Sequence, residues 1–165
     1  MKKIPIFISI IGFIFGCSSS DEGGIDCTLY DPAFPSLHIR IVDSAGTNLI
    51  DNGVIDPNNI SVEGDFPNAQ FQIVPDYEFV SSDPDNGALN YSLSVVIPRK
   101  ATFKYTINLA DINTTYSFDF TAKLMHLPCD ISFFTPVKGS SNNQQFKLLE
   151  VRPLQFVGDL KIQNY

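Results

Sequence analysis

The chain has 165 residues, of which 44% are hydrophobic and 18% charged, and its formal net charge is −7. This length and apolar content suit one globular domain with a core of its own and argue against wholesale disorder. The acidic balance leaves no basic patch to neutralise phosphates, which argues against nucleic acid as a partner and against electrostatic docking on anionic lipid.

The chain opens with a short cationic segment and an apolar run. Met1–Lys3 contains two lysines, and the twelve residues Ile4–Phe15 are apolar apart from a proline, a serine and a glycine. A helix across a bilayer needs about 20 residues, so this run is too short to span one. It matches the apolar region of a secretory signal peptide. We therefore expect residues 1–16 to be a leader whose removal takes the net charge from −7 to −9.

The leader ends in a four-residue motif, Ile14-Phe15-Gly16-Cys17. This motif resembles the lipobox of bacterial lipoproteins, which reads aliphatic, any residue, small residue, cysteine. The resemblance implies that Cys17 is acylated, labels with palmitate and becomes the mature N-terminus. Acyl chains contribute ~0.8 kcal/mol for each buried CH2, so several chains make a stable membrane anchor. The alternative is an ordinary signal peptide in which Cys17 has no special role.

Residues 17–27 are the predicted tether. The serines, acids and glycines of Ser18–Gly24 predict a flexible and solvated segment. The run is similar to the serine-plus-acidic export signal of Bacteroidetes-type surface lipoproteins. That resemblance implies transport to the outer membrane and display on the cell surface. The alternative is an anchor that faces the periplasm.

If Cys17 carries lipid, two cysteines remain, Cys27 and Cys129. An even remainder in an exported protein indicates a disulfide. The bond would close a loop of about 100 residues, which corresponds to as much as ~4.7 kcal/mol in the chain-entropy description. It would fix the segment after the tether to a late strand. The alternative is a pair of buried free thiols.

Beyond the tether, apolar and polar residues alternate with period two, the pattern of half-buried strands. The expected strands lie at residues 37–42, 70–73, 91–97, 103–109, 116–124, 129–134, 146–151 and 154–162. Turn-forming residues separate them at 43–46, 51–53, 56–59, 83–87 and 139–143. No stretch shows a sustained helical period. Residues 28–165 are therefore predicted to be all-β, a single antiparallel β-sandwich, with a barrel as the main alternative.

The segment Ile39–Leu49 reads strand, Asp43, turn, Gly46, Leu. It is similar to the opening hairpin of transthyretin-like and immunoglobulin-like modules, which are frequent in bacterial surface lipoproteins. The resemblance implies a sandwich of one of these kinds.

The sequence offers few candidates for catalysis or metal binding. His38 falls on the outward side of a predicted strand, and His126 lies near a cysteine without a second ligand pair for zinc. Asp83–Gly87 lacks the spacing of an EF-hand loop, so a plain turn is expected there, with a looser calcium site involving Asp76 or Glu78 as the alternative. We expect no catalytic residue, no metal and no cofactor.

Four aromatic residues fall outside clean alternation, in proline-rich or acidic stretches: Tyr30, Phe34, Tyr77 and Phe79. They are the candidate contact patch for a partner. The alternative is that they cover the ends of the sandwich.

These observations predict a non-enzymatic lipoprotein of the outer membrane and cell surface, with a role in binding, adhesion or assembly and a protein or glycan ligand. For assembly, the strand at residues 154–162 is the candidate for pairing across chains. One alternative is an accessory glycan- or nutrient-binding lipoprotein of an outer-membrane uptake system. The other is a hydrolase whose carboxylate pair only the fold would reveal.

Overall fold

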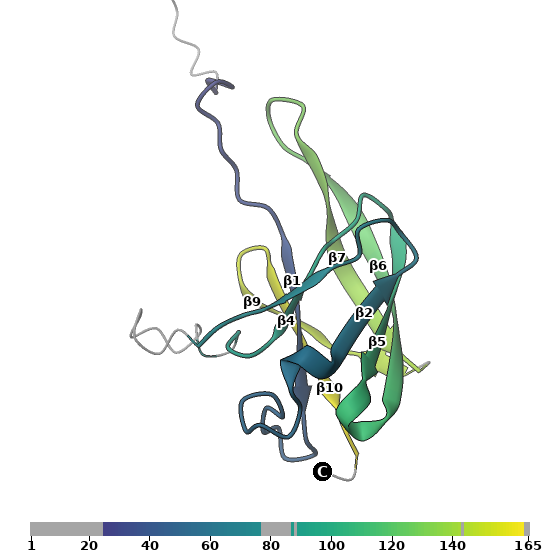
Figure 1. The fold of residues 1–165 in the computed structure, drawn as a ribbon. Helices are drawn as coiled ribbons and strands as arrows, with labels where there is room; N and C mark the ends of the chain where they lie inside the picture. The colour runs from purple at the N-terminus through teal and green to yellow at the C-terminus, as the bar shows by residue number, and fades with distance from the viewer. Residues whose placement is uncertain (1–24, 77–86, 88, 143, 164–165) are drawn as a thin grey trace, which may run out of the picture.

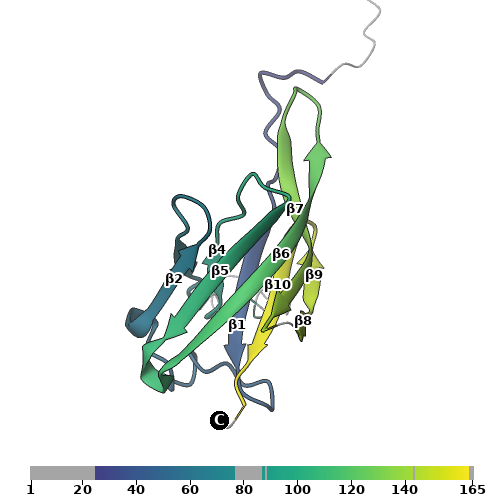
Figure 2. The ribbon, with the colours of Figure 1, turned by 90° about the vertical axis from the view of Figure 1, so that its right-hand side faces the viewer.

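The computed structural model describes residues 25–76, 87, 89–142 and 144–163. These residues form two separate five-stranded β-sheets that pack face to face (Figures 1 and 2). The predicted all-β sandwich is therefore confirmed. In the part of the chain that is described, no helix has the length and apolar character needed to cross a membrane.

The first sheet has the order β3-β4-β1-β10-β9. Its strands are β1 (Ser36–Val42), β3 (Phe71–Ile73), β4 (Leu93–Val95), β9 (Leu148–Arg152) and β10 (Gln155–Lys161). The second sheet has the order β2-β5-β6-β7-β8. Its strands are β2 (Ile60–Gly64), β5 (Thr102–Leu109), β6 (Thr114–His126), β7 (Ser132–Ser141) and β8 (Gln144–Phe146). Two short 3-10 turns, η1 (Pro57–Asn59) and η2 (Ala110–Ile112), precede β2 and β6.

One strand pair is parallel, β1 with β10, and the other pairs of named strands are antiparallel. The expected late strand thus lies inside the first sheet, between β1 and β9. β1 pairs with it along Gln155–Lys161 and β9 pairs with it along Gln155–Gly158. This pairing within its own chain counts against the hypothesis that the strand pairs across chains.

The core between the sheets is rich in aromatic rings. Phe118 and Phe120 of β6 are at most 2% exposed, and the Phe118 ring lies 5.0 Å from that of Phe146 in an edge-to-face arrangement. Gly158 of β10 faces the Phe146 ring, and a Cβ at this position would overlap it. Glycine is needed there because the aromatic ring occupies the space of a side chain.

A turn follows β1 at residues 43–47, and a single bridge joins Val42 to Asn48 beyond it. The backbone N–H of Thr47 donates to Oδ1 of Asp43 at 2.8 Å, and the N–H of Asp43 donates to the carbonyl of Thr47 at 3.0 Å. Gly46 adopts a φ of +93°, which glycine tolerates best. The hydrogen bond from the Thr47 N–H stabilises the carboxylate and lowers the pKa of Asp43.

Several strand boundaries differ from the prediction. Cys129 and Asp130 have positive φ and form a turn, so β7 begins only at Ser132. It then continues through residues 139–141, where a turn was expected, because this stretch pairs with β6 on one side and β8 on the other. Tyr91 also has positive φ, which shortens the strand expected at 91–97 to β4. The pattern did not predict β2.

The β6–β7 hairpin extends past the other strands (Figure 1). β5 pairs with β6 as far as Thr121, and β7 carries an extra residue, Val137, at a bulge opposite Thr121 and Ala122. Beyond Thr121, among the described strands, β6 pairs only with β7. We call residues 123–135 the distal hairpin. Residues 25–35, which precede β1, lie at the same end of the molecule, and we call them the strap (Figures 1 and 2).

Candidate functional site

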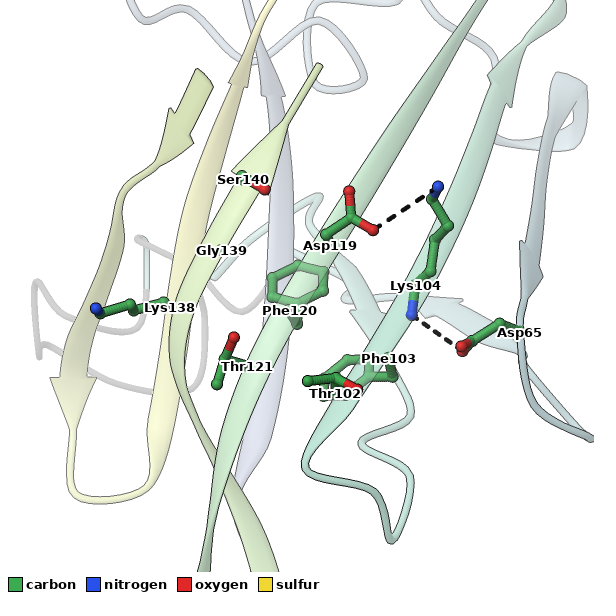
Figure 3. Close-up of a pocket in the computed structure, with 10 residues that line it drawn as sticks. All are labelled: Asp65, Thr102, Phe103, Lys104, Asp119, Phe120, Thr121, Lys138, Gly139 and Ser140. Carbon is green, nitrogen blue, oxygen red and sulfur yellow. Dashed lines mark hydrogen bonds and ion pairs between the residues drawn. The ribbon is translucent and has the colours of Figure 1, made fainter. Parts of the chain in front are cut away.

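A polar groove crosses the outer face of the second sheet (Figure 3). It is built from two rows of side chains in register on β5, β6 and β7. One row is Thr102, Thr121 and Lys138, and the other is Lys104, Asp119 and Ser140. The strand period of two places these polar residues outward because the intervening Phe103 and Phe120 point into the core.

The groove has a volume of about 750 Å³, and Asp65, which follows β2, closes one side of it. The N–H of Lys104 donates to Oδ1 of Asp65 at 3.0 Å, and Nζ of Lys100 donates to the Asp65 carbonyl at 2.9 Å. The Lys104 hydrogen bond, together with the charge of Lys100 3.6 Å from the carboxylate, lowers the pKa of Asp65. Asp65 is therefore an ionised hydrogen-bond acceptor at this wall.

Inside the groove, Nζ of Lys104 lies 3.7 Å from Oδ1 of Asp119, and both side chains are about half exposed. Exposed ion pairs of this kind contribute roughly 0–1 kcal/mol to stability. The Lys104 ammonium and the Asp119 carboxylate can therefore exchange this pair for contacts with a ligand at little cost to the fold.

The groove has the chemistry of a hydrogen-bonding surface. The hydroxyls of Thr102, Thr121 and Ser140 both donate and accept, and the ammonium of Lys138 donates. The two rings in the lining, Phe103 and Phe120, are 3% and 2% exposed. They offer no face for a sugar to stack on, so recognition here depends on polar contacts.

The described residues contain no group of three or more His, Cys, Asp or Glu side chains able to hold a metal ion. Asp76, one candidate ligand of the looser calcium site, accepts a hydrogen bond from Nδ2 of Asn90 at 2.8 Å. Glu78 and residues 83–86 of that loop lie outside the described residues.

His38 corrects the prediction of an outward-facing surface histidine. Its side chain does lie on the face of β1 opposite Leu37 and Ile39, but only 6% of it is exposed. Burial lowers the pKa of His38, which favours the neutral imidazole.

The hydrogen bonds around His38 define its tautomer. Oγ of Ser92 donates to the carbonyl of Leu89 at 2.6 Å, so this oxygen accepts from Nδ1 of His38 at 3.3 Å. Nε2 is then the acceptor for the hydroxyl of Ser36 at 3.0 Å. Both ring nitrogens are satisfied, and His38 is a structural residue of the first sheet.

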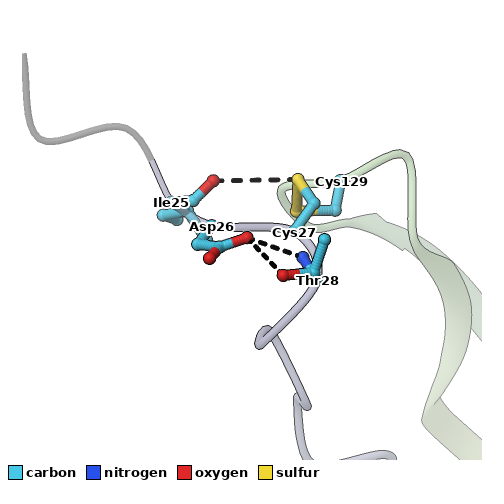
Figure 4. The surroundings of a disulfide bond; sticks show 5 residues. All are labelled: Ile25, Asp26, Cys27, Thr28 and Cys129. Atoms are coloured by element: carbon cyan, nitrogen blue, oxygen red, sulfur yellow. Dashed lines mark hydrogen bonds between the residues drawn. A yellow bond between two sulfur atoms is a disulfide. The ribbon is translucent and has the colours of Figure 1, made fainter.

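Cys27 and Cys129 form a disulfide with a Cα–Cα distance of 5.5 Å (Figure 4). The predicted pair is confirmed, and the alternative of two free thiols is wrong. The bond joins the strap to the turn between β6 and β7, whereas the prediction placed its second half on a strand. His126 lies beside this turn at the end of β6 and is exposed.

Two members of the predicted contact patch lie in the strap. Tyr30 is half-buried, and Phe34 is 58% exposed although its ring packs edge-on against Phe133 at 5.8 Å. Tyr77 and Phe79 lie outside the described residues, as does Cys17. The contact patch therefore stays a prediction.

Sequence reasoning missed the groove because its residues read as the ordinary polar side of three strands. The available signal was the set of residues alternating with the core aromatics, but the rows form only when the strands are paired in register. Leu124, expected on the apolar side of its strand with the core residues, is 42% exposed.

Comparison with known proteins found no matching family model, curated protein or solved structure.

Proposed function

We propose that the protein is a lipid-anchored β-sandwich of the outer membrane, displayed on the cell surface, that binds an extended polar ligand without catalysis. The groove across β5, β6 and β7 carries this proposal. Its two rows of polar side chains lie on paired strands, so their spacing is preset before a ligand arrives.

The cellular address is proposed from the N-terminal sequence. The motif Ile14-Phe15-Gly16-Cys17 resembles a lipobox, and the following Ser18–Gly24 is similar to a surface-export signal. A domain exposed outside the cell meets polymers and proteins too large for a closed pocket, which an open groove accommodates.

Between the ligand classes, the geometry favours a polar stretch of polypeptide. The buried Phe103 and Phe120 present no ring to a sugar, while Lys104, Asp119 and the neighbouring hydroxyls match the amides and charged side chains of a peptide. A glycan bound for an outer-membrane uptake system is the second candidate. The hydroxyl-rich row Thr102, Thr121 and Lys138 supports it, because it suits a carboxylated sugar.

A hydrolytic role for the groove carboxylates has less support. A general acid in glycoside hydrolysis needs a raised pKa, whereas the Lys104 N–H and Lys100 lower the pKa of Asp65. The other groove carboxylate, Asp119, is paired with the ammonium of Lys104 at 3.7 Å.

Arrays of peptides and glycans, probed with the full-length protein in detergent micelles, test ligand binding. We expect Lys104→Ala with Lys138→Ala to weaken the signal at least tenfold. The matched control is Lys147→Ala with Lys161→Ala, two exposed lysines outside the groove. Equal loss in both double variants, or none in either, contradicts binding at the groove. Cleavage of an arrayed glycan would favour the hydrolase instead.

The anchor has its own test. We expect labelled palmitate to enter the wild-type protein and not Cys17→Ser, and external protease to digest the wild-type protein on intact cells. A Cys17→Ser variant that still labels contradicts the lipobox assignment. Protection from protease on intact cells contradicts surface display and favours an anchor that faces the periplasm.

A further inference from the structure

Exposed apolar side chains concentrate at one end of the molecule. Among the described residues, nine large hydrophobic side chains are exposed, and five of these belong to the strap or to the distal hairpin: Ile25, Leu29, Phe34, Leu124 and Met125. Leu29 is 81% exposed and Ile25 is 52% exposed. Apolar side chains gathered in this way mark a surface for contact with another apolar phase.

The strap and the distal hairpin are held together as one unit. The Cys27–Cys129 disulfide joins their ends, and the rings of Phe34 and Phe133 pack at 5.8 Å farther along the strap. The N–H of Leu127 donates to the carbonyl of Ile131 at 2.8 Å and closes the turn. These contacts fix the strap and the distal hairpin relative to each other.

The length of chain before the strap determines what lies near this surface. Seven residues lie between Cys17 and Ile25, and the eight Cα-to-Cα steps that join the two positions reach at most about 28 Å when the chain is extended. An acyl anchor on Cys17 thus keeps the strap within that distance of a bilayer. Because the disulfide ties the strap to the hairpin, Leu124 and Met125 belong to the same anchored end. A tether this short gives the surface a high effective concentration at the membrane.

The charges at this end are mostly acidic, with Asp26, Asp31 and Asp130 against Lys123. Asp26 is ionised, because the hydroxyl and N–H of Thr28 donate to its carboxylate at 2.7 and 2.9 Å and lower its pKa. Asp130 is a second carboxylate on the turn. Such a surface gains nothing from anionic lipid. Its leucines, isoleucine and methionine suit shallow insertion among zwitterionic headgroups.

We propose that the strap and the distal hairpin form a bilayer-facing end of the molecule, in which Ile25 and Leu29 of the strap, and Leu124 and Met125 on the two faces of β6, contact the headgroup–acyl boundary. The contact sets the orientation of the sandwich, and therefore of the groove on its second sheet, relative to the membrane. This inference rests on the proposed acylation of Cys17.

The chain has no tryptophan, so a single introduced indole reports its own distance from lipid. The full-length acylated protein is reconstituted in phosphatidylcholine vesicles with brominated acyl chains. We expect Leu29→Trp and Met125→Trp to be quenched at least threefold more than Val54→Trp and Leu149→Trp, exposed controls away from this end. Equal quenching of the four variants overturns the inference.

Further measurements distinguish the bilayer-facing surface from the proposed acylation of Cys17 and from contact with a second copy of the chain. Mass spectrometry of the reconstituted protein measures the acyl chains on Cys17; their absence overturns both the proposed anchor and the bilayer-facing surface. An acylated protein whose four tryptophans are quenched equally overturns only the surface. Reduction of the disulfide should lower the quenching of Met125→Trp, since the hairpin is then freed from the strap. Cross-linking of Met125→Cys between copies, without lipid quenching, would assign the surface to a second copy.

Discussion

The body of the sandwich and its distal end are stabilised in different ways. In the body, the rings of Phe118, Phe120 and Tyr105 are at most 2% exposed, and the Phe120 ring lies next to Phe118 on its own strand and Tyr105 on the neighbouring strand. At the distal end, Leu124 and Met125 are 42% and 37% exposed. The body is stabilised mainly by burial of apolar surface, whereas the distal end is held by the β6–β7 ladder, the disulfide and the Phe34–Phe133 pair.

Strand β6 runs through both regions and shows why they differ. Phe118, Phe120 and Leu124 share one phase of the alternation, yet only the first two are buried. The strand continues beyond the point where β5 stops pairing with it and past the bulge at Thr121 and Ala122. An apolar residue in the right phase is therefore buried only where a second layer faces it.

The largest loss of stability should come from a substitution in the core of the body. Phe118→Ala removes a fully buried ring beside Phe120 and Phe146, and we expect a loss of about 3–5 kcal/mol in the free energy of unfolding. Urea denaturation measures this. Phe34→Ala, at the 58%-exposed strap ring, is the matched control and should cost much less. Equal losses would contradict the contrast between the two regions.

Breaking the distal end should have a smaller effect. Cys27→Ser with Cys129→Ser opens a loop that spans 102 residues of sequence, and loss of such a bond typically costs about 2–4 kcal/mol through the unfolded state. The same variant should be cleaved by protease within the strap before the body unfolds. Unchanged stability and unchanged strap cleavage would show that the disulfide does not hold this end.

A pH titration of stability sharpens the contrast, because His38 lies in the body and His126 lies at the distal end. Burial lowers the pKa of His38 below its ordinary 6.5, so the unfolded state binds the proton more readily. Its contribution to stability is complete above pH 6.5 and decreases as the pH falls below that value, by at most about 1.4 kcal/mol per pH unit. His38→Gln should flatten this slope, and His126→Gln, at the exposed end of β6, is the control variant. A slope that His38→Gln leaves unchanged in chemical denaturation across pH 4–8 would contradict a buried neutral His38.

The smallest effect is expected at the Arg40–Asp159 pair on the outer face of the first sheet. Nε and Nη2 of Arg40 donate to the two carboxylate oxygens at 2.7 and 3.0 Å, with both side chains about 30% exposed. Asp159→Asn should lower the free energy of unfolding by about 0.5–1 kcal/mol. This difference between the variant and the wild-type protein should disappear in high salt. A loss that persists unchanged in 1 M salt would contradict an ion pair as its cause.

The sequence alone determined the features that depend on local pattern. Period-two alternation marked β1, β5, β6 and β10, because each of these strands has one face on the core. The Asp43 and Gly46 turn was readable because a carboxylate acceptor and a residue tolerant of positive φ are both local requirements. Once Cys17 is set aside, two cysteines are left, and this even number indicated the bond between Cys27 and Cys129.

Tertiary structure decided what depends on residues far apart in the chain. The parallel pairing of β1 with β10 joins the two ends of the domain, and no local pattern encodes it. Burial of His38 depends on Ser92, and the end of burial along β6 depends on where β5 stops. The groove rows exist only in the register of three strands. Alternation specifies that a strand has two faces, but the packing of the second sheet and of the loops determines which positions on each face are covered.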